Sequence, residues 1–368
     1  MARIEFKNVS HSFEIAEGKE KLEWAVNDIN IIWEDGVANA LLGPSGCGKT
    51  TMLNIISGLL MPSEGKVYID GKDVTELSTR ERHIAQVFQF PVIYDSMNVY
   101  NNLAFPLVNA KVSSSKIRAK VEKIAEILGL VDYLEFPSSK LNSAEKQKVS
   151  LGRGIIRDDT VGILLDEPLT VIDPKMRGEL RRQLKIIQRE LNITAIYVTH
   201  DQHEALTFAD EVAIMKDGRI VQVGSPHELY SDPESPFIGY FIGSPGMNIL
   251  DGKLNKSNLS LKEFDIEFSK DFRDKIKIKN GECQLGIRPE AIITSKVKTK
   301  GTIPFEIIIV ENMGSYKILT LIKKNESNRN LRIKSRTDID MSVSKGETVY
   351  LKFPEEYLKI FKDNHKIY

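Results

Sequence analysis

The stretch Gly43-Pro44-Ser45-Gly46-Cys47-Gly48-Lys49-Thr50 lies between an apolar run and a helical pattern, and its spacing is GxxxxGK[ST]. Glycines allow the backbone to approach a polyphosphate closely and to turn several N–H groups toward it. The helix that follows, expected from Lys49 to Leu59, directs its positive N-terminus at the same anion. Lys49 supplies a cation for the outer phosphates, and the Thr50 hydroxyl is placed to ligate Mg²⁺.

The alternative is a glycine-rich turn that joins a strand to a helix and binds nothing. The flanking patterns disfavour it, because Val37–Leu42 has the composition of a buried strand. The expected apolar stripe of the helix consists of Met52, Leu53, Ile56 and Leu59. The sequence therefore predicts a nucleoside triphosphate site.

Length and composition limit the classes of protein that need to be considered. The 368 residues, 41% of them hydrophobic, suggest two or three domains with packed cores. The 51 basic and 51 acidic residues balance, so no global field favours nucleic acid as a partner. The two cysteines, Cys47 and Cys283, are far apart, which is typical of a reducing compartment without disulfides.

No stretch approaches the roughly 18 apolar residues that a membrane-spanning helix needs. The segment Met1–Glu5 lacks the apolar core of a signal peptide. We therefore expect a cytosolic chain, or one that is attached to a membrane only through a partner.

Strand and helix patterns alternate over the first 240 residues, which predicts an α/β core with a mostly parallel sheet. Expected strands are Ile4–Val9, Trp24–Trp33, Val37–Leu42, Lys66–Ile69, Val161–Leu165, Thr194–Val198, Val212–Met215 and Arg219–Val223. Residues 90–160 are more helical, with a clear stripe over Lys116–Leu128. Asp173-Pro174 predicts the start of another helix. Its expected stripe is Met176, Leu180, Leu184, Ile187 and Leu191.

The sequence pattern changes after Ser244-Pro245-Gly246, from alternating strands and helices to short β-rich runs. Short β-rich runs, at Gly301–Val310, Lys317–Ile322 and Thr348–Phe353, are separated by Lys, Asn and Gly. We expect a small β-barrel domain over residues 245–368.

Polar residues that follow the expected strands supply a second half of the site. Asp166 and Glu167 end a buried strand, where Asp166 can hold Mg²⁺ and Glu167 can polarise a water for attack on the γ-phosphate. His200 ends the next strand and should emerge at the same carboxyl edge. Gln89 follows another candidate strand and could reach the Mg²⁺ or the water.

Each of these residues also has a structural interpretation. The carboxylates could form an acidic turn, His200 could be a satisfied structural residue, and Gln89 could be a surface side chain. Phe13 could stack on adenine or be an ordinary core aromatic. The presence of the carboxylates, His200 and Gln89 on a chain with a full phosphate loop favours the functional interpretation of these residues, while both interpretations of Phe13 stay open.

The phosphate loop and the polar residues after the expected strands, taken in their order along the chain, resemble the ATP-binding subunits of ABC transporters. The match covers nearly all of the first 240 residues: the Walker A loop 43–50, the Gln89 loop, the Walker B run 163–168, the Asp173 loop and the His200 switch. The resemblance implies an ATPase that uses ATP and Mg²⁺, with a P-loop ABC domain at 1–240 and a helical subdomain near 90–160. It also implies a head-to-tail dimer whose closure moves membrane subunits between inward- and outward-facing states. Such a subunit is peripheral, at the cytoplasmic face of the inner membrane.

The resemblance assigns roles residue by residue. The catalytic residues are Glu167, His200 and Gln89. The nucleotide ligands are Phe13, Gly43, Pro44, Ser45, Gly46, Cys47, Gly48, Lys49, Thr50, Thr51 and Asp166. The Mg²⁺ ligands are Thr50, Gln89 and Asp166. The residues around Tyr94–Leu103 should receive the coupling helix of a transmembrane permease subunit. The aromatic side chains of Phe90, Tyr94, Tyr100 and Phe105 could form its apolar socket, and core packing is the alternative for about half of them.

The C-terminal part indicates a subclass. Leu285-Gly286-Ile287-Arg288-Pro289-Glu290, with Met247-Asn248, is similar to the oligonucleotide-binding-like (TOBE) domain of carbohydrate importers. That similarity implies dimerisation and regulation by residues 245–368, and a packed β-domain with no regulatory role is the alternative. The runs Phe90–Met97 and Leu169–Pro174 are similar to subunits for glycerol-type import. The expected solute is thus a sugar or a polyol, delivered indirectly by a solute-binding protein.

One segment departs from the family. The signature Leu-Ser-Gly-Gly-Gln, which faces the nucleotide of the partner subunit, aligns here with Leu141-Asn142-Ser143-Ala144-Glu145. Glu145 would add negative charge near a polyanion. We therefore expect a heterodimer with a second ATPase subunit that has an intact signature. A homodimer that tolerates the altered signature is the alternative.

Two other functions compete with solute import. One is a non-transport ATPase of the same superfamily that acts as a nucleotide-driven conformational switch. Such proteins usually carry two cassettes or a long coiled coil, and this sequence has one GxxxxGK[ST] loop and no sustained heptads. The other is a regulatory protein whose ATP site is mostly structural.

Overall fold

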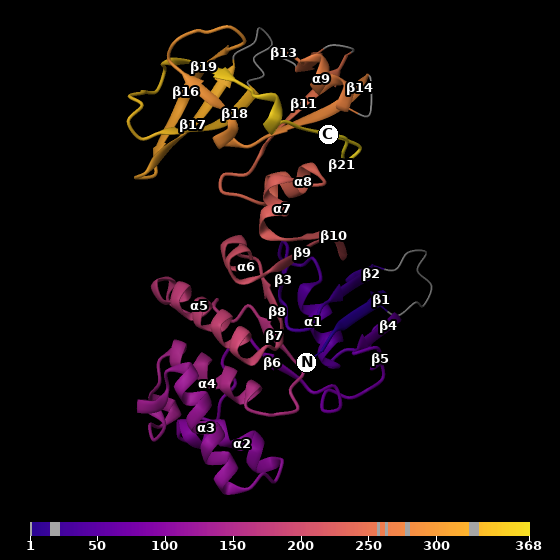
Figure 1. The fold of residues 1–368 in the computed structure, drawn as a ribbon, viewed down its shortest axis with the longest axis vertical. Coiled ribbons are helices and arrows are strands. Elements are labelled where there is room, and N and C mark those ends of the chain that lie inside the picture. The colour runs from indigo at the N-terminus through magenta and orange to yellow at the C-terminus, as the bar shows by residue number, and fades with distance from the viewer. Residues whose placement is uncertain (1, 15–22, 256–257, 262–263, 277–279, 324–330) are drawn as a thin grey trace. The chain divides into compact units, whose positions relative to one another are not determined.

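The computed structural model describes residues 2–14, 23–255, 258–261, 264–276, 280–323 and 331–368. The chain forms two compact units, Met1–Pro226 and His227–Tyr368 (Figure 1). The first unit combines helices with strands and the second is mainly strand, as the sequence predicts. In the described residues no helix is both long and apolar enough to cross a membrane.

A six-stranded sheet forms the centre of the first unit, in the order β10-β9-β3-β8-β7-β6. Its strands are β3 (Ala38–Leu42), β6 (Ile84–Val87), β7 (Gly162–Asp166), β8 (Thr194–Thr199), β9 (Glu211–Lys216) and β10 (Arg219–Gly224). All neighbours are parallel except β9 and β10, the expected strands at Val212–Met215 and Arg219–Val223, which form a hairpin around Asp217-Gly218. The carboxyl ends of β3, β8, β7 and β6 therefore meet at one edge, where ligands bind in open α/β sheets.

A second, antiparallel sheet has the order β2-β1-β4-β5. It consists of β1 (Ile4–His11), β2 (Val26–Trp33), β4 (Glu64–Ile69) and β5 (Lys72–Asp73). Helix α1 (Lys49–Ser57) shares one core with both sheets, because its Leu53 lies in the same buried cluster as Phe6 of β1 and Leu164 of β7. This burial on two sides fixes the helix that follows the phosphate loop.

Helix α1 ends earlier than the sequence predicts. Gly58 adopts a left-handed conformation (φ 79°) that ends the helix at Ser57, so Leu59 lies outside it and is 57% exposed. The guanidinium of buried Arg82 donates to the carbonyls of Ile55 (2.6 Å) and Ile56 (3.0 Å) and caps this end. The assignment of Leu59 to the buried stripe was therefore wrong, because the cap replaces the last helical turn.

Further α-helices in the described part of the first unit are α2 (Val99–Asn109), α3 (Ser114–Leu128), α4 (Ser143–Ile155), α5 (Pro174–Leu191) and α6 (Gln202–Phe208). Helices α2, α3 and α4 gather as one group at the end of this unit (Figure 1). Helix α5 is capped by the Asp173 carboxylate, which accepts from Lys175 N (2.9 Å), and it buries Leu180 as expected. Met176, in its exposed first turn, is 43% exposed and does not belong to the stripe.

The second unit contains two antiparallel sheets around one core. One has the order β13-β12-β11-β14-β20-β21 and the other β15-β19-β16-β17-β18. The strands of the first are β11 (Asn248–Leu254), β12 (Asn258–Leu261), β13 (Asp265–Glu267), β14 (Gly281–Ile287), β20 (Lys359–Lys362) and β21 (His365–Lys366). Those of the second are β15 (Ile293–Ser295), β16 (Ile303–Asn312), β17 (Tyr316–Lys323), β18 (Leu331–Asp338) and β19 (Thr348–Lys352). The short helices are α7 (Pro226–Ser231), α8 (Pro236–Phe241) and α9 (Lys270–Lys275).

Arg288, the arginine of the Leu285–Glu290 run, has a structural role in this unit. Its guanidinium is buried and donates to the carbonyls of Tyr230 (2.6 Å) and Gly239 (3.0 Å), in α7 and α8. These bonds attach both helices to the second unit. The boundary between the two units along the chain therefore falls between Pro226 and His227, whereas the sequence placed it between residues 240 and 245.

Candidate nucleotide site

The phosphate loop connects the end of β3 to the start of α1. Gly48, the residue before the helix, has φ 102°, and a Cβ atom there would lie 2.3 Å from the carbonyl oxygen of Ala25. Only glycine fits this position. Helix α1 has no side-chain cap and no acidic residue in its first turn. Its first N–H groups are therefore left for an anion, as the sequence predicts for a phosphate site.

Lys49 and Cys47 lie on the inner side of this loop. Lys49 is 6% exposed, and its ammonium donates to the carbonyls of Gly43 (2.9 Å) and Pro44 (2.8 Å). An ammonium has three donors, so the same group can bind the loop and a phosphate oxygen. Burial raises the pKa of the Cys47 thiol, and nearby Lys49 opposes this shift. Cys47 is thus a small neutral packing residue at this position.

Asp166 and Glu167 follow β7 at the same edge of the sheet. Burial raises the pKa of Asp166, the neighbouring Glu167 carboxylate raises it further, and Lys49 lowers it. The charges of Lys49 and Asp166 are therefore close enough to interact. Glu167 has φ 46°, a left-handed conformation that is uncommon outside glycine and is often found at functional sites.

The side chain of Glu167 is held by two neighbours. Its Oε1 accepts from His200 Nδ1 (2.9 Å), and its Oε2 accepts from Thr170 Oγ1 (3.3 Å). The backbone N–H of Glu167 donates to Val198 O (2.9 Å) of β8, so the two strand ends are fixed to each other. The predicted proximity of Glu167 and His200 is therefore observed.

A buried carboxylate positions the segment that carries His200. Glu204 accepts from Tyr197 OH (3.0 Å) and Thr199 Oγ1 (2.9 Å), and it is 5% exposed. Burial, followed by the charge of Glu204, holds the pKa of Tyr197 well above its usual value. Asp201 caps α6 by accepting from His203 N (2.8 Å). His200 lies between a fixed strand and a capped helix, and its side chain is 53% exposed.

Sequence reasoning missed Thr170 and Glu204. Glu204 follows Asp201 by three residues, and an Asp-x-x-Glu pattern before a helix is a signal for capping that could have drawn attention to it. Thr170 has no such local signal, because its contact with Glu167 depends on the fold of the loop after β7.

Gln89 lies in the bend after β6 and is half-buried. Side chains of α4 hold the segment around it: Gln147 Nε2 donates to Phe88 O (3.2 Å), and the guanidinium of Arg153 lies 4.6 Å from the Tyr94 ring centroid. Residues 88–94, which include Gln89, therefore contact α4 at both ends. Phe90 is 68% exposed, so it is not a core aromatic.

Phe13 lies just after β1 and is 68% exposed, so the core interpretation of this residue is wrong. Its ring packs edge-on against His11, with centroids 4.7 Å apart. Burial lowers the pKa of His11. Stacking of Phe13 on adenine stays a prediction.

The segment Asn142–Glu145 begins α4. Asn142 Oδ1 accepts from Glu145 N (2.9 Å), and Glu145 Oε2 accepts from Asn142 N (2.9 Å), which is a complete capping box. The hydroxyl of Tyr133 also hydrogen-bonds the Glu145 carboxylate, which raises the pKa of Tyr133. The capping box therefore satisfies the N–H groups of Asn142 and Glu145 at the start of α4.

The donor set at the β7 edge fits Mg²⁺. In the described residues no three His, Cys, Asp or Glu side chains form a metal cluster. Mg²⁺ in nucleotide sites needs none, because it is held by one or two carboxylates together with substrate phosphates and water. Thr50, which is exposed at the start of α1, and Asp166 would supply the protein oxygens for such an ion.

Comparisons with known proteins agree with this geometry. The family described as ABC transporter matches residues 26–170, and the family described as MalK OB fold domain matches residues 243–292. The trehalose/maltose import ATP-binding protein MalK of Thermococcus litoralis is 40% identical over 312 residues, which are 81% of this chain and 84% of that protein.

The sn-glycerol-3-phosphate import ATP-binding protein UgpC of Psychromonas ingrahamii is 37% identical over 342 residues, covering 92% of this chain and 89% of the relative. Among solved structures, the ATP-binding cassette MJ0796, a dimer in a post-hydrolysis state with ADP and Pi, is 27% identical with a TM-score of 0.53. It covers 61% of this chain and 98% of its own.

Proposed function

The chain belongs to the ABC transporter family and is an ATPase, and from this premise we propose that it energises the import of a carbohydrate or polyol. The observation that carries the proposal is the meeting of Lys49, Asp166, Glu167 and His200 at one sheet edge. Relatives that match both units are import ATP-binding proteins for trehalose, maltose and sn-glycerol-3-phosphate.

In the proposed reaction the N–H groups of the phosphate loop and the Lys49 ammonium bind the phosphates of ATP. Thr50, Asp166 and Gln89 would hold Mg²⁺, which would neutralise charge on the phosphates. Glu167 accepts a proton from the water that attacks the γ-phosphate. His200 donates from Nδ1 to Glu167 and so orients this base. Thr170 holds its second oxygen.

We further propose that the chain works as one of two ATPase subunits beneath transmembrane permeases, at the cytoplasmic face of the membrane. The exposed aromatic side chains of Phe88, Phe90 and Tyr94 offer a surface for a permease loop. They are attached to α4 through Gln147 and Arg153. Movement at the nucleotide can therefore pass to the permease through this segment.

The capping box at α4 supports an asymmetric pair. Glu145 places a carboxylate where the family signature faces the γ-phosphate of the partner, and like charges in a water-excluded contact are unfavourable. A second ATPase subunit with an intact signature would complete the nucleotide site of this chain. The opposite site, which contains Asn142–Glu145, would bind ATP and turn over slowly.

The test is to purify the transport complex from its native cells through a tagged permease subunit, so that any second ATPase subunit is present. The expected complex hydrolyses ATP faster when the permeases are present, and it contains two different ATPase subunits. A complex with two copies of this chain would refute the asymmetric pair. The absence of permease stimulation would refute the import function.

A further inference from the structure

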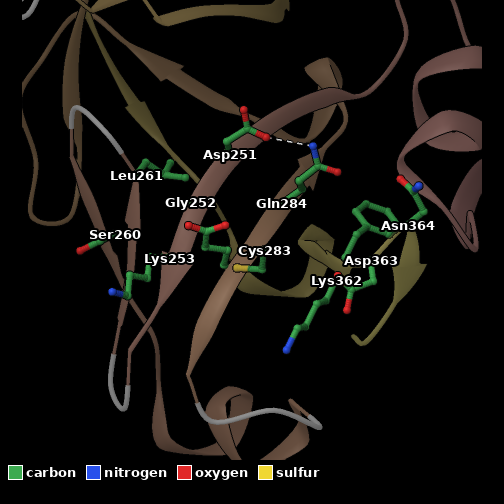
Figure 2. A pocket seen from close by; sticks show the side chains of 12 residues that line it. Asp251, Gly252, Lys253, Ser260, Leu261, Cys283, Gln284, Lys362, Asp363 and Asn364 are labelled. Carbon is green, nitrogen blue, oxygen red and sulfur yellow. Dashed lines mark hydrogen bonds between the residues drawn. The ribbon is translucent and has the colours of Figure 1, made fainter.

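The second unit contains a cavity of about 640 Å³ that ATP chemistry does not use. It lies on one face of the sheet that includes β11, β12 and β14, and the turn at Asp363 and Asn364 forms one wall (Figure 2). We call it the sheet cavity. Its volume lies in the range of about 300–1,000 Å³ that is typical of small-molecule sites.

The strand register explains why polar side chains line it. Asp251 pairs with Gln284 across β11 and β14, and Lys253 pairs with Glu282, so all four point to the same face. The alternate residues, such as Leu250 and Leu285, lie in the core. The lining is thus the outer face of the sheet.

Two polar side chains of this lining hydrogen-bond each other. Gln284 Nε2 donates to Asp251 Oδ1 (2.9 Å), as the dashed line in Figure 2 shows. A carboxylate has a second oxygen and an amide has a further donor and an acceptor, so each can bind a ligand without losing this bond. The pair is a preformed element with donors and acceptors side by side.

The charges of the lining select a class of ligand. The carboxylates of Asp251, Glu282 and Asp363 outnumber the ammonium groups of Lys253 and Lys362. A polyanion such as a nucleic acid would meet three carboxylates, which is unfavourable. A neutral molecule with many hydroxyl groups can donate to the carboxylates and accept from the lysines and amides.

The lining also contains Phe361, which pairs with Gln284 across β14 and β20 and lies on the same face, whereas Leu261 and Cys283 belong to the core behind the sheet. Apolar walls with a few placed polar groups are typical of ligand sites. The three strands also lie within residues 243–292, which the OB-fold family matches. OB folds bind oligosaccharides or oligonucleotides on a strand face, and the carboxylates favour the former.

We propose that the sheet cavity binds a neutral sugar or polyol. The site is separate from the phosphate loop and does not depend on ATP hydrolysis. It gives the second unit a small-molecule ligand of its own.

Binding is measured on the full chain without nucleotide, by saturation-transfer NMR and titration calorimetry. The probes are maltose, trehalose, arabinose and glycerol, with glycerol 3-phosphate and a single-stranded oligonucleotide as anionic probes. We expect at least one neutral probe to bind and the anionic probes to bind more weakly or not at all. The absence of binding by all four neutral probes, or tighter binding of the oligonucleotide, would overturn the proposal.

Asp251→Asn and Gln284→Leu should each raise the dissociation constant of the neutral probe about tenfold. Asp251→Asn replaces one acceptor oxygen of the lining by a donor, and Gln284→Leu removes an amide donor and acceptor. Asp340→Asn makes the same change of charge as Asp251→Asn at an exposed turn outside the cavity, and it should leave binding unchanged. Equal binding by all three variants would place the sugar elsewhere. ATP binding, measured separately, should be normal in all of them, so failure here leaves the proposed ATPase function intact.

Discussion

Two helix N-termini in the first unit differ in how their unpaired backbone N–H groups are treated: one has no side-chain cap and the other has a capping box. Helix α1 starts after Gly48, with no side-chain cap, and Lys49 lies beside its first N–H groups. Helix α4 starts after Asn142, and a capping box with Glu145 satisfies its terminus. The first N–H groups of any helix lack partners within the helix.

The difference shows how a side chain decides what a helix terminus can bind. At α1 the missing cap leaves positive N–H groups for a phosphate. At α4 the Asn142 side chain accepts from Glu145 N, and the carboxylate of Glu145, bonded to Asn142 N, adds negative charge at the same end of the helix. We infer that the α1 terminus is open to a phosphate, whereas the charge of Glu145 closes the α4 terminus to close phosphate contact, so that ATP at that site turns over slowly. Four predictions test this difference and the chemistry of the open site.

The largest expected effect is on the chemical step at the open site. Glu167→Gln should lower ATP hydrolysis by about 10²–10⁴-fold, because a positioned general base contributes a factor of this size. Nucleotide affinity should change little, since the phosphate loop is untouched. The measurement pairs steady-state ATPase activity of the purified complex with nucleotide binding at equilibrium. A Glu167→Gln complex with unchanged turnover would assign the base to another residue.

Lys49→Ala should weaken ATP binding by roughly 10–100-fold, because a hydrogen bond to a charged group contributes about 1.5–3 kcal/mol. The ammonium also holds the carbonyls of Gly43 and Pro44, so the loop loses an internal contact. Equilibrium binding of a fluorescent ATP analogue measures the loss.

Lys148→Ala provides a matched control for that change. It removes a lysine from α4, away from the phosphate loop, and should leave ATP affinity unchanged. Similar affinity in the two variants would contradict the role of the open terminus.

At the closed terminus the charge of Glu145 can be separated from its cap. Glu145→Gln keeps a residue that completes a capping box. It should raise the ATPase rate of the complex roughly two- to fivefold, because a charge at a helix terminus is worth about 0.3–1 kcal/mol. The rate is measured at saturating ATP. An unchanged rate would show that the carboxylate does not limit this site.

Asn142→Ala is the companion variant, because it removes the cap and keeps the charge. It should destabilise the first unit by about 0.5–2 kcal/mol. Chemical denaturation of the chain measures this loss, and Glu145→Gln should show little of it.

The smallest expected effect is on stability at Asp166. Burial raises the pKa of this carboxyl in the folded chain, so its ionised form is disfavoured there. Its contribution favours the folded state at low pH and is lost as the pH rises through the raised pKa. At neutral pH Asp166→Asn should therefore raise the Tm slightly without nucleotide, and it should weaken Mg²⁺-dependent ATP binding.

Thermal unfolding at neutral pH and below the ordinary pKa of an aspartate measures this difference. The gain in Tm should disappear at the lower pH. A gain that is the same at both values would mean that packing, and not ionisation, stabilises the variant.

Much of the site was predictable because its signals are local. Glycine spacing predicts the loop, and apolar runs followed by Asp166-Glu167 or His200 predict strand ends at one edge. Parallel strands between helices then bring those ends together. The Asn142–Glu145 cap is also local, since Asn-x-x-Glu is a capping pattern, but alignment with the family signature directed attention to what the segment lacks.

By itself, the sequence determined the phosphate loop, the strand-end carboxylates and the division into an α/β part and a β-rich part. Only the tertiary structure decided which neighbours these residues have: the left-handed backbone of Glu167 with its bonds to His200 and Thr170, and Arg82 at the end of α1. The sheet cavity around Asp251 and Gln284 likewise depends on strand pairing. Short-range periodicity is set by the chain's own geometry, whereas these contacts join residues far apart in sequence and exist only once the core has formed.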